Sequence, residues 1–335
     1  MAKIVLAMAT THGPQLHTTP EQWLLRLPAD QKAMHPFRDG VYSFDQLTKM
    51  RASEGLAEKS SMKGIESSHH RCHVAMETLA DKWEEIGADV AVILGNDQRE
   101  VFNDEFNPAF MIYYGDKLPN YPQTEERRAQ LPPGIRESEF GHATETYTEY
   151  DALPSLAEHM IEHMSANEFD VAASKVWPKQ ARNGVGHAFG HIYRQVMRDK
   201  VVPNVPVLQN TFFPPNQPSA KRAYEFGRQV KKAIDSWDSN LKVAIFASGG
   251  MSHFVIDEDF DRRFVSALRN KDRDYLTKIP LKHLQSGTSE LKSWISLGGV
   301  MEDMNVEMHE IDYVPCYRST AGTGTANGFY WWDVK

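Results

Sequence analysis

Residues 243–253 read Val243-Ala244-Ile245-Phe246-Ala247-Ser248-Gly249-Gly250-Met251-Ser252-His253. Five apolar residues in succession are typical of a strand that is buried on both faces, and a glycine pair lets the backbone turn sharply at its end. Polar side chains that follow such a turn lie at the rim of a sheet, where binding sites are built. His253 is therefore a candidate acid/base group, although the same pattern also fits a plain turn in which His253 caps the next segment.

Two more apolar runs end in the same way. Residues 4–9 are followed by Thr10-Thr11-His12-Gly13-Pro14, and residues 90–94 are followed by Gly95-Asn96-Asp97-Gln98. In an open α/β sheet the carboxyl ends of the parallel strands share one edge, and ligands bind along that edge. We therefore expect the three polar clusters to meet.

Strand-like runs alternate with longer helical patterns along the chain, which predicts an α/β fold with a mixed central β-sheet flanked by helices. Strands are expected at residues 3–9, 89–95, 109–114, 169–174, 205–211, 242–247 and 310–315. Helices are expected at residues 67–87, capped by Ser67 or Ser68, and at 153–164, 187–199, 218–236, 259–269 and 288–297.

Two long stretches, residues 14–66 and 115–150, have scattered proline, glycine and charge and little periodicity. Loops of this length inside a compact domain are more often functional than idle, so both stretches are predicted to be lid-like insertions. Residues 1–335 are then expected to form a single domain that carries these two insertions. The glycine-rich residues 322–328 are followed by no helix that could receive a phosphate, so a dinucleotide site is not expected.

Composition excludes several classes of protein. The net charge is -8, and the chain lacks the clustered Lys and Arg of a nucleic-acid-binding surface. The two cysteines, Cys72 and Cys316, lie far apart in the sequence and predict a reduced, cytoplasmic protein. The N-terminal apolar run is too short for a signal peptide, and no stretch approaches the roughly 18 apolar residues of a membrane span.

Fourteen histidines invite a metal site. His159, Glu162 and His163 spell the inverted zinc-peptidase pattern, in which two imidazoles bind zinc and the glutamate activates water. The apolar residues of the predicted helix 153–164 lie on the opposite face, so the same three residues also fit a solvated helix surface.

Four motifs in sequence order make the chain resemble the class III extradiol ring-cleavage dioxygenases. They are Thr11-His12, Gly95-Asn96-Asp97-Gln98, the Gly249–His253 segment, and Glu290-Leu291-Lys292-Ser293-Trp294. The two insertions extend beyond the catalytic subunit of protocatechuate 4,5-dioxygenase, and single-chain members that act on 3-O-methylgallate or on lignin-derived biphenyl catechols are the most similar in organisation. In the protocatechuate enzyme a separate small subunit covers the active site, so residues 14–66 or 115–150 are expected to do so here.

The resemblance implies a ferrous iron site with His12 and Glu290 as ligands. The third ligand of the family is a histidine after Asn-Asp, and this chain has Gln98 at that position. An amide oxygen is neutral like imidazole but a weaker donor, so Gln98 as the third ligand would lower the affinity for iron. Alternatively another histidine takes the place of the missing one, either His17, which is nearest in sequence, or one of His69, His70 and His73.

The resemblance also implies the roles of other residues. His253 matches the acid/base of the family, and the histidine of Asn183-Gly184-Val185-Gly186-His187 matches a second active-site histidine. Thr323, ahead of Asn327-Gly328-Phe329, matches a hydroxyl that binds the substrate carboxylate, although the segment also fits a plain polar loop.

The resemblance predicts an Fe(II)-dependent dioxygenase that cleaves the ring of a catechol- or gallate-type aromatic acid with O2. Its substrate would be derived from lignin, such as 3-O-methylgallate or a dihydroxylated dicarboxybiphenyl. A homodimer is a base-rate expectation. The alternatives are a non-catalytic binding protein of the same fold, which Gln98 favours, and the zinc peptidase.

Overall fold

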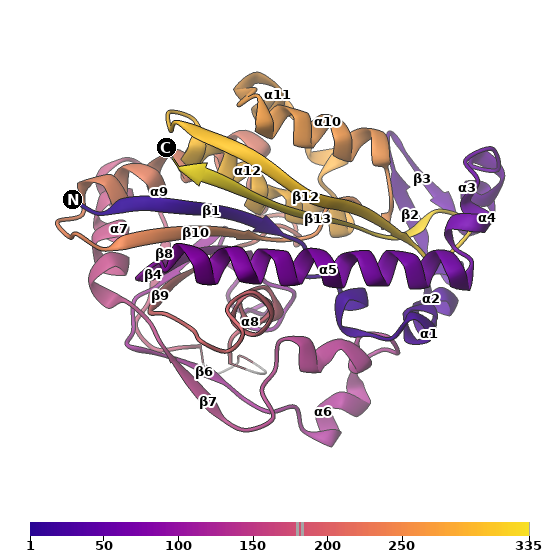
Figure 1. The fold of residues 1–335 in the computed structure, drawn as a ribbon, viewed down its shortest axis with the longest axis horizontal. Coiled ribbons are helices and arrows are strands. Elements are labelled where there is room, and N and C mark those ends of the chain that lie inside the picture. The colour runs from indigo at the N-terminus through magenta and orange to yellow at the C-terminus, as the bar shows by residue number, and fades with distance from the viewer. Residues whose placement is uncertain (179–180, 182–183, 335) are drawn as a thin grey trace.

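The computed structural model describes residues 1–178, 181 and 184–334 (Figure 1). Asn183, which belongs to the motif before His187, lies outside the described residues. The strands are β1 (Lys3–Thr10), β2 (Met34–Phe37), β3 (Gly40–Ser43), β4 (Val90–Asn96), β5 (Phe110–Tyr113), β6 (Lys117–Asn120), β7 (Thr148–Asp151), β8 (Ala172–Ser174), β9 (Asn204–Gln209), β10 (Lys242–Ser248), β11 (His253–Val255), β12 (Val306–Tyr317) and β13 (Thr323–Val334).

Helices surround these strands. They are α1 (Pro20–Trp23), α2 (Leu27–Lys32), α3 (Phe44–Met50), α4 (Leu56–Lys59), α5 (Met62–Ile86), α6 (Glu125–Gln130), α7 (Pro154–Ala166), α8 (His187–His191), α9 (Ala220–Ser236), α10 (Glu258–Arg269), α11 (Arg273–Lys278) and α12 (Leu291–Met301). Shorter 3-10 turns are η1 (Pro14–His17), η2 (Leu24–Arg26), η3 (Arg136–Gly141), η5 (Leu281–His283) and η6 (Ser286–Glu290), and η4 (Ile192–Val196) is a π-helical turn.

The centre of the molecule is a mixed sheet of nine strands within the described residues, in which β1, β10, β4 and β9 run parallel as neighbours. Strand β13 pairs antiparallel with β1, and β5 pairs antiparallel with β9. The predicted mixed α/β fold is confirmed. The carboxyl ends of β1, β10 and β4 lie side by side, as expected from their polar continuations.

The sheet is buried on both faces. On β10 the side chains of Val243 and Ile245 join one core cluster, and Ala244 and Phe246 join the other. Helices α9 and α12 contribute to the first cluster, and α5 and α8 contribute to the second. The long helix α5 crosses the front of the sheet in Figure 1. This two-sided burial explains why the central strands are continuous apolar runs rather than alternating ones.

The predicted elements are found with shifted boundaries. Helix α5 begins at Met62 rather than residue 67, and its cap is Ser61, whose side chain accepts a hydrogen bond from the backbone N–H of Gly64. Ser67 and Ser68 therefore lie inside the helix, where the Ser68 hydroxyl donates to the Gly64 carbonyl. Of the predicted strand 169–174, only β8 forms.

Strand β13 was not predicted, because glycine weakens a strand and the segment contains Gly324 and Gly328. It nevertheless pairs with β1, β11 and β12 and is almost entirely buried. Neighbouring strands on its edges supply the pairing that local propensity does not.

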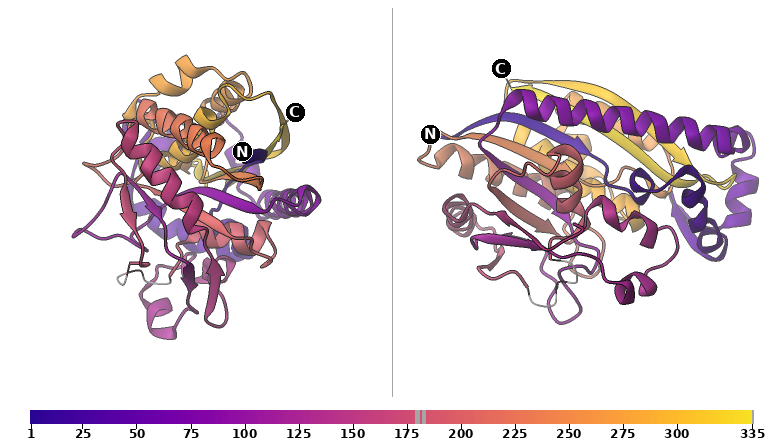
Figure 2. Two further views of the ribbon diagram at one scale, coloured as in Figure 1. Left: turned by 90° about the vertical axis from the view of Figure 1, so that its left-hand side faces the viewer. Right: turned by 60° about the horizontal axis from the view of Figure 1, so that its bottom comes forward.

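Both predicted insertions contain short elements. Residues 14–66 form α1 to α4 and the hairpin β2–β3, and residues 115–150 form the β6–β7 pair with α6 between them. The two insertions meet where η1 packs against η3, and the right-hand view of Figure 2 shows the short indigo helices of the first insertion beside the magenta helix of the second. In the described part of the chain, no helix has the length and apolarity that a membrane crossing requires.

Candidate metal centre and active site

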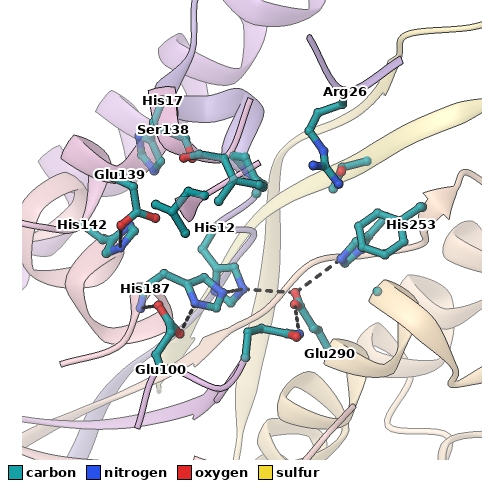
Figure 3. Close-up of a pocket in the computed structure, with 18 of the residues that line it drawn as sticks. His12, His17, Arg26, Glu100, Ser138, Glu139, His142, His187, His253 and Glu290 are labelled. Carbon is teal, nitrogen blue, oxygen red and sulfur yellow. Dashed lines mark hydrogen bonds and ion pairs between the residues drawn. The ribbon is translucent and has the colours of Figure 1, made fainter. Parts of the chain in front are cut away.

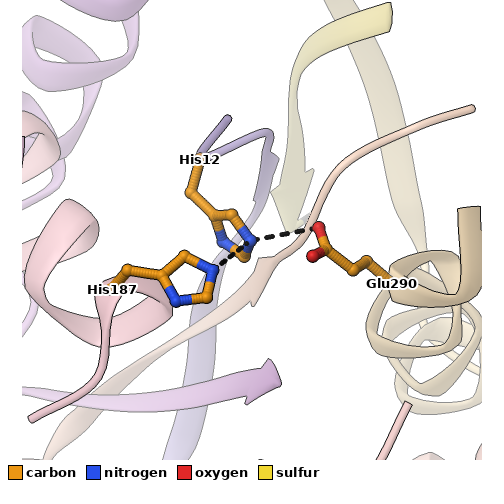
Figure 4. A group of neighbouring side chains, drawn as sticks. All are labelled: His12, His187 and Glu290. Atoms are coloured by element: carbon orange, nitrogen blue, oxygen red, sulfur yellow. Dashed lines mark hydrogen bonds and ion pairs between the residues drawn. The ribbon is translucent and has the colours of Figure 1, made fainter. Parts of the chain in front are cut away.

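Three potential metal ligands converge at the carboxyl edge of the sheet. His12 lies two residues after the end of β1, His187 begins α8, and Glu290 ends η6 just before α12. The ligand atoms of these three residues all lie within 4.8 Å of one another (Figure 4). The His12 Nε2 atom is 3.1 Å from Glu290 Oε2 and 3.1 Å from His187 Nε2. Two imidazoles and one carboxylate form a donor set that suits a divalent transition metal with open coordination positions.

His12 is held so that its Nε2 lone pair faces this centre. The Ser248 hydroxyl donates to the Ala188 carbonyl at 2.6 Å, so its oxygen accepts the hydrogen bond from His12 Nδ1 at 2.9 Å. Burial lowers the pKa of His12, which favours the neutral imidazole that a metal requires. Ser248, the last residue of β10, thereby fixes the tautomer of the histidine that follows β1.

His187 is oriented by a carboxylate that sequence reasoning did not identify. Its Nδ1 donates to Glu100 Oε2 at 2.5 Å, and its backbone N–H donates to Glu100 Oε1 at 2.9 Å. Although burial opposes charge on both groups, their mutual attraction raises the pKa of His187 to about 9 and lowers the pKa of Glu100 to about 2. A carboxylate behind a histidine is the usual arrangement that orients a metal ligand.

Glu290 is buried and accepts hydrogen bonds on both oxygens. Oε2 accepts from the backbone N–H of Gly250 at 2.6 Å, and Oε1 accepts from the side-chain amides of Asn96 and Gln98, each at 3.2 Å. Burial alone would raise the pKa of Glu290, but His12 and His253 hold it well below its usual value. Its negative charge requires a balancing cation, which a protonated His187 or a metal ion supplies. The residues therefore fit a bound metal.

His253 stands beside this centre with one ring nitrogen free. Its Nδ1 donates to the Met251 carbonyl at 2.7 Å, so Nε2 carries a lone pair and lies 3.7 Å from Glu290 Oε2. The ring packs between two glycines, because a Cβ at Gly250 would lie 2.3 Å from the ring and a Cβ at Gly287 would lie 1.9 Å from it. The glycine pair thus provides close approach to the ring as well as a turn.

Asp261 fixes the segment that carries His253. Its Oδ1 accepts from the backbone N–H of Ser252 at 3.0 Å, and its Oδ2 accepts from the hydroxyls of Ser252 at 2.6 Å and Tyr313 at 2.7 Å. The Ser252 hydroxyl in turn accepts from the backbone N–H of Asp257 at 2.8 Å. Complete burial outweighs these hydrogen bonds and raises the pKa of Asp261 to about 7.

This raised pKa predicts a pH dependence of stability. Between about pH 4 and pH 7 the folded chain holds a proton on Asp261 that the unfolded chain has released, so the free energy of unfolding falls as the pH rises, by up to about 1.4 kcal/mol per pH unit from this group. Urea unfolding at pH 5, 6 and 7 should show a smaller decrease for Asp261→Asn than for wild type. The exposed Asp238→Asn variant should behave like wild type, and an unchanged slope in Asp261→Asn would contradict the expectation.

A cavity of about 540 Å³ opens over these groups (Figure 3), within the range of sites that hold small molecules. Both insertions line it, the first with residues such as Trp23 and Arg26 and the second with residues such as Ser138 and His142. Burial lowers the pKa of His17 to about 3 and of His142 to about 4, so these two lining imidazoles are neutral.

The structure brings together His12, Gln98, His187, His253 and Glu290, all of which line the cavity.

The structure does not bring Thr323 into the cavity. Strand register pairs Thr325 with His253 and Thr323 with Val255, so Thr325 lines the cavity and the Thr323 hydroxyl instead contacts the Ser319 hydroxyl at 2.7 Å.

The alternative histidines do not reach the three converging ligands. His17 lines the cavity, but its Nε2 contacts His191 Nδ1 at 3.1 Å. His69 and His73 are in contact with each other, and His70 is exposed. Among the described residues, none of these joins the group of converging ligand atoms.

The zinc-peptidase pattern does not form a metal site. The His159 ring contacts the Ser236 hydroxyl at 2.9 Å, His163 donates to Gln229 Oε1 at 3.0 Å, and both partners belong to α9. Glu162 is exposed. Within the described chain these residues form no ligand cluster, because the i, i+4 spacing here serves helix packing.

Sequence reasoning missed Glu100, Arg26 and His142. Glu100 lies only two residues after Gln98, and an acidic residue so near a candidate ligand is a usable signal. Arg26 and His142 lie in insertions whose course the sequence does not reveal, so no local signal marks them.

Known proteins with similar sequences include aromatic ring-opening dioxygenases. Residues 77–326, more than half of the chain, match the family described as the catalytic LigB subunit of aromatic ring-opening dioxygenase. The chain is also similar to gallate dioxygenase of Pseudomonas putida, at 27% identity over 179 residues that cover 48% of this chain and 49% of that protein. The match thus spans about half the length of the relative. The chain belongs to the LigB family of aromatic ring-opening dioxygenases.

Proposed function

We propose that this protein is an Fe(II)-dependent extradiol dioxygenase that opens the ring of a catechol- or gallate-type aromatic acid with O2. The observation that carries the proposal is the convergence of His12, His187 and Glu290 at the floor of a cavity, with His253 beside them. The similarity to a gallate dioxygenase supports a substrate of this class, such as a lignin-derived 3-O-methylgallate or dihydroxylated dicarboxybiphenyl.

His12, His187 and Glu290 would hold the metal, which would supply open coordination positions for the two substrate hydroxyls and for O2. The chain itself supplies the proton transfers. The Nε2 lone pair of His253 can take a phenolic proton and later return it, because the Met251 carbonyl fixes the proton on Nδ1. Both insertions line the cavity and would limit the access of water. Residues 1–335 then form one catalytic domain whose cover belongs to the same chain.

We propose His187, rather than Gln98, as the third ligand. Glu100 orients His187 with its Nε2 toward His12, whereas the side-chain amide nitrogen of Gln98 donates to Glu290. Gln98 then supports the carboxylate ligand instead of the metal. This arrangement retains two imidazoles and one carboxylate despite the glutamine.

Metal affinity separates the two assignments. His187→Ala is expected to weaken the binding of Fe(II) or Co(II) by more than about 100-fold. Gln98→Ala should weaken it by no more than roughly 10- to 100-fold, the usual cost of losing a residue that supports a metal ligand. Calorimetry on the metal-free protein measures both values without relying on activity. His159→Ala, on α7, serves as the control. The reverse order of effects would make Gln98 the ligand.

Oxygen uptake tests the function itself. The protein is reconstituted with Fe(II) without oxygen and then assayed at an oxygen electrode with gallate, 3-O-methylgallate, protocatechuate and a dihydroxylated biphenyl carboxylate. Stoichiometric uptake with one of them and a ring-opened product is the expected result. A protein that binds these compounds but consumes no oxygen would instead be the non-catalytic binding protein of the same fold. The cytoplasmic location and the homodimer stay predictions.

A further inference from the structure

Arg26 is a cation in the cavity wall to which the proposed chemistry gives no role. It ends η2 in the first insertion, is half-buried, and lines the cavity. In the described part of the chain its guanidinium forms no hydrogen bond or ion pair. Figure 3 shows its guanidinium pointing into the cavity from the side opposite His187 and near His253.

The carboxylate of Asp30, which attracts Arg26, is already paired with another arginine. Asp30 receives two parallel hydrogen bonds from Arg318, at 2.5 Å from Nε and 2.8 Å from Nη2, and both partners are buried. Burial and the charge of Arg318 lower the pKa of Arg26, but an arginine remains protonated in proteins. Arg26 is thus a charged group, partly removed from water, without a counter-ion of its own. Such a group is stabilised by an anion that enters the cavity.

The second insertion holds this arginine in place. A Cβ at Gly134 would lie 2.8 Å from both Cγ and Cδ of Arg26, so the backbone of residue 134 packs directly against the arginine stem. Contact between the two insertions therefore directs the guanidinium toward the space between them.

Other lining groups do not replace this charge. Arg318 is neutralised by Asp30, and His17 and His142 are neutral. Arg127 of α6 also lines the cavity and is a competing candidate for the same role.

We propose that Arg26 binds the carboxylate of the aromatic acid substrate through a two-point guanidinium–carboxylate pair. This inference rests on the proposed function, since it places the diol at the metal centre and the acid group at the opposite end of the ring. A ring held at both ends has one orientation in the cavity. Arg26 is then the residue that selects aromatic acids over neutral catechols.

Two substrates that differ only in the carboxylate test whether Arg26 selects aromatic acids. The KM for gallate is expected to rise roughly 10- to 100-fold in Arg26→Gln, while the KM for pyrogallol, the same triol without the carboxylate, stays within about twofold. Arg26→Lys should show a smaller rise for gallate, because an ammonium keeps the charge but loses the two-point geometry. Arg128→Gln, on α6 but outside the cavity lining, is the matched control. An equal loss with both substrates, or the selective loss in Arg127→Gln instead, would overturn the proposal.

Binding to metal-free protein keeps this test separate from the proposed function. Calorimetry with 3,4-dimethoxybenzoate, which carries the carboxylate but no diol, is expected to show binding to wild type that is lost in Arg26→Gln and retained in Arg128→Gln. If wild type consumes no oxygen with any catechol yet shows this dependence, the proposed function fails and the carboxylate site stands. If ring cleavage occurs but Arg26→Gln leaves both measurements unchanged, the carboxylate site fails and the proposed function stands.

Discussion

The Glu290→Gln variant is expected to bind no catalytic metal ion and to lose ring-opening activity by roughly 10⁴-fold or more, the scale seen when one member of a cooperating catalytic group is removed. Glu290 provides the anionic donor among the three converging residues. An amide of nearly the same shape keeps the packing but removes the charge that attracts a divalent cation. The loss should therefore reflect the metal rather than the fold.

Thermal unfolding with and without metal tests the role of Glu290 as a metal ligand independently of catalysis. A ligand present at 100 times its dissociation constant stabilises a protein by about 2.7 kcal/mol, so Fe(II) or Co(II) should raise the melting temperature of wild type but not of Glu290→Gln. Glu258→Gln removes a carboxylate that contacts Lys59 and Tyr317 instead, and its response to metal should match wild type. A Glu290→Gln protein that still turns over catechols would exclude Glu290 as a ligand.

The His253→Gln variant is expected to keep its metal and lose roughly 10²- to 10⁴-fold in kcat, the usual contribution of a general acid/base. Glutamine fills much of the same space and still forms hydrogen bonds, but it does not exchange a proton near neutral pH. His253 lies 3.7 Å from Glu290 and outside the group of converging ligand atoms, so metal affinity should change little.

Steady-state kinetics together with metal analysis separate the possible roles of His253. His283→Gln is the control, because this histidine contacts Asp39 and lies outside the lining of the catalytic cavity. A fall in kcat at unchanged metal content supports the acid/base role. Equal loss of metal and activity would instead make His253 a ligand, and a kcat within a few-fold of wild type would remove it from the proton transfers.

Much of the site could be predicted because a short apolar run in the sequence indicates where each central strand ends. The apolar runs before His12, Gln98 and His253 specify strands buried on both faces, and parallel strands bring their carboxyl ends to one edge. The motif resemblance added Glu290, which ends η6 and immediately precedes α12.

The rest depended on contacts between distant segments. Glu100 orients His187 across 87 residues of sequence, and Gln98 meets Glu290 across 192 residues. Neither spacing has a period that a sequence pattern could reveal. Local signals indicate that a side chain is polar and near a strand end, but they do not indicate which atom it faces.

The α/β class, the central strands and most of the residues around the candidate centre follow from the order of amino acids, because apolar runs and helical periodicity are local properties of the chain. How those residues are used depends on the folded arrangement. The register of β13 opposite β11 brings Thr325 rather than Thr323 into the cavity, and the packing of the two insertions directs Arg26 into it. Register and insertion packing follow from the burial of whole surfaces against one another, which is a property of the assembled fold.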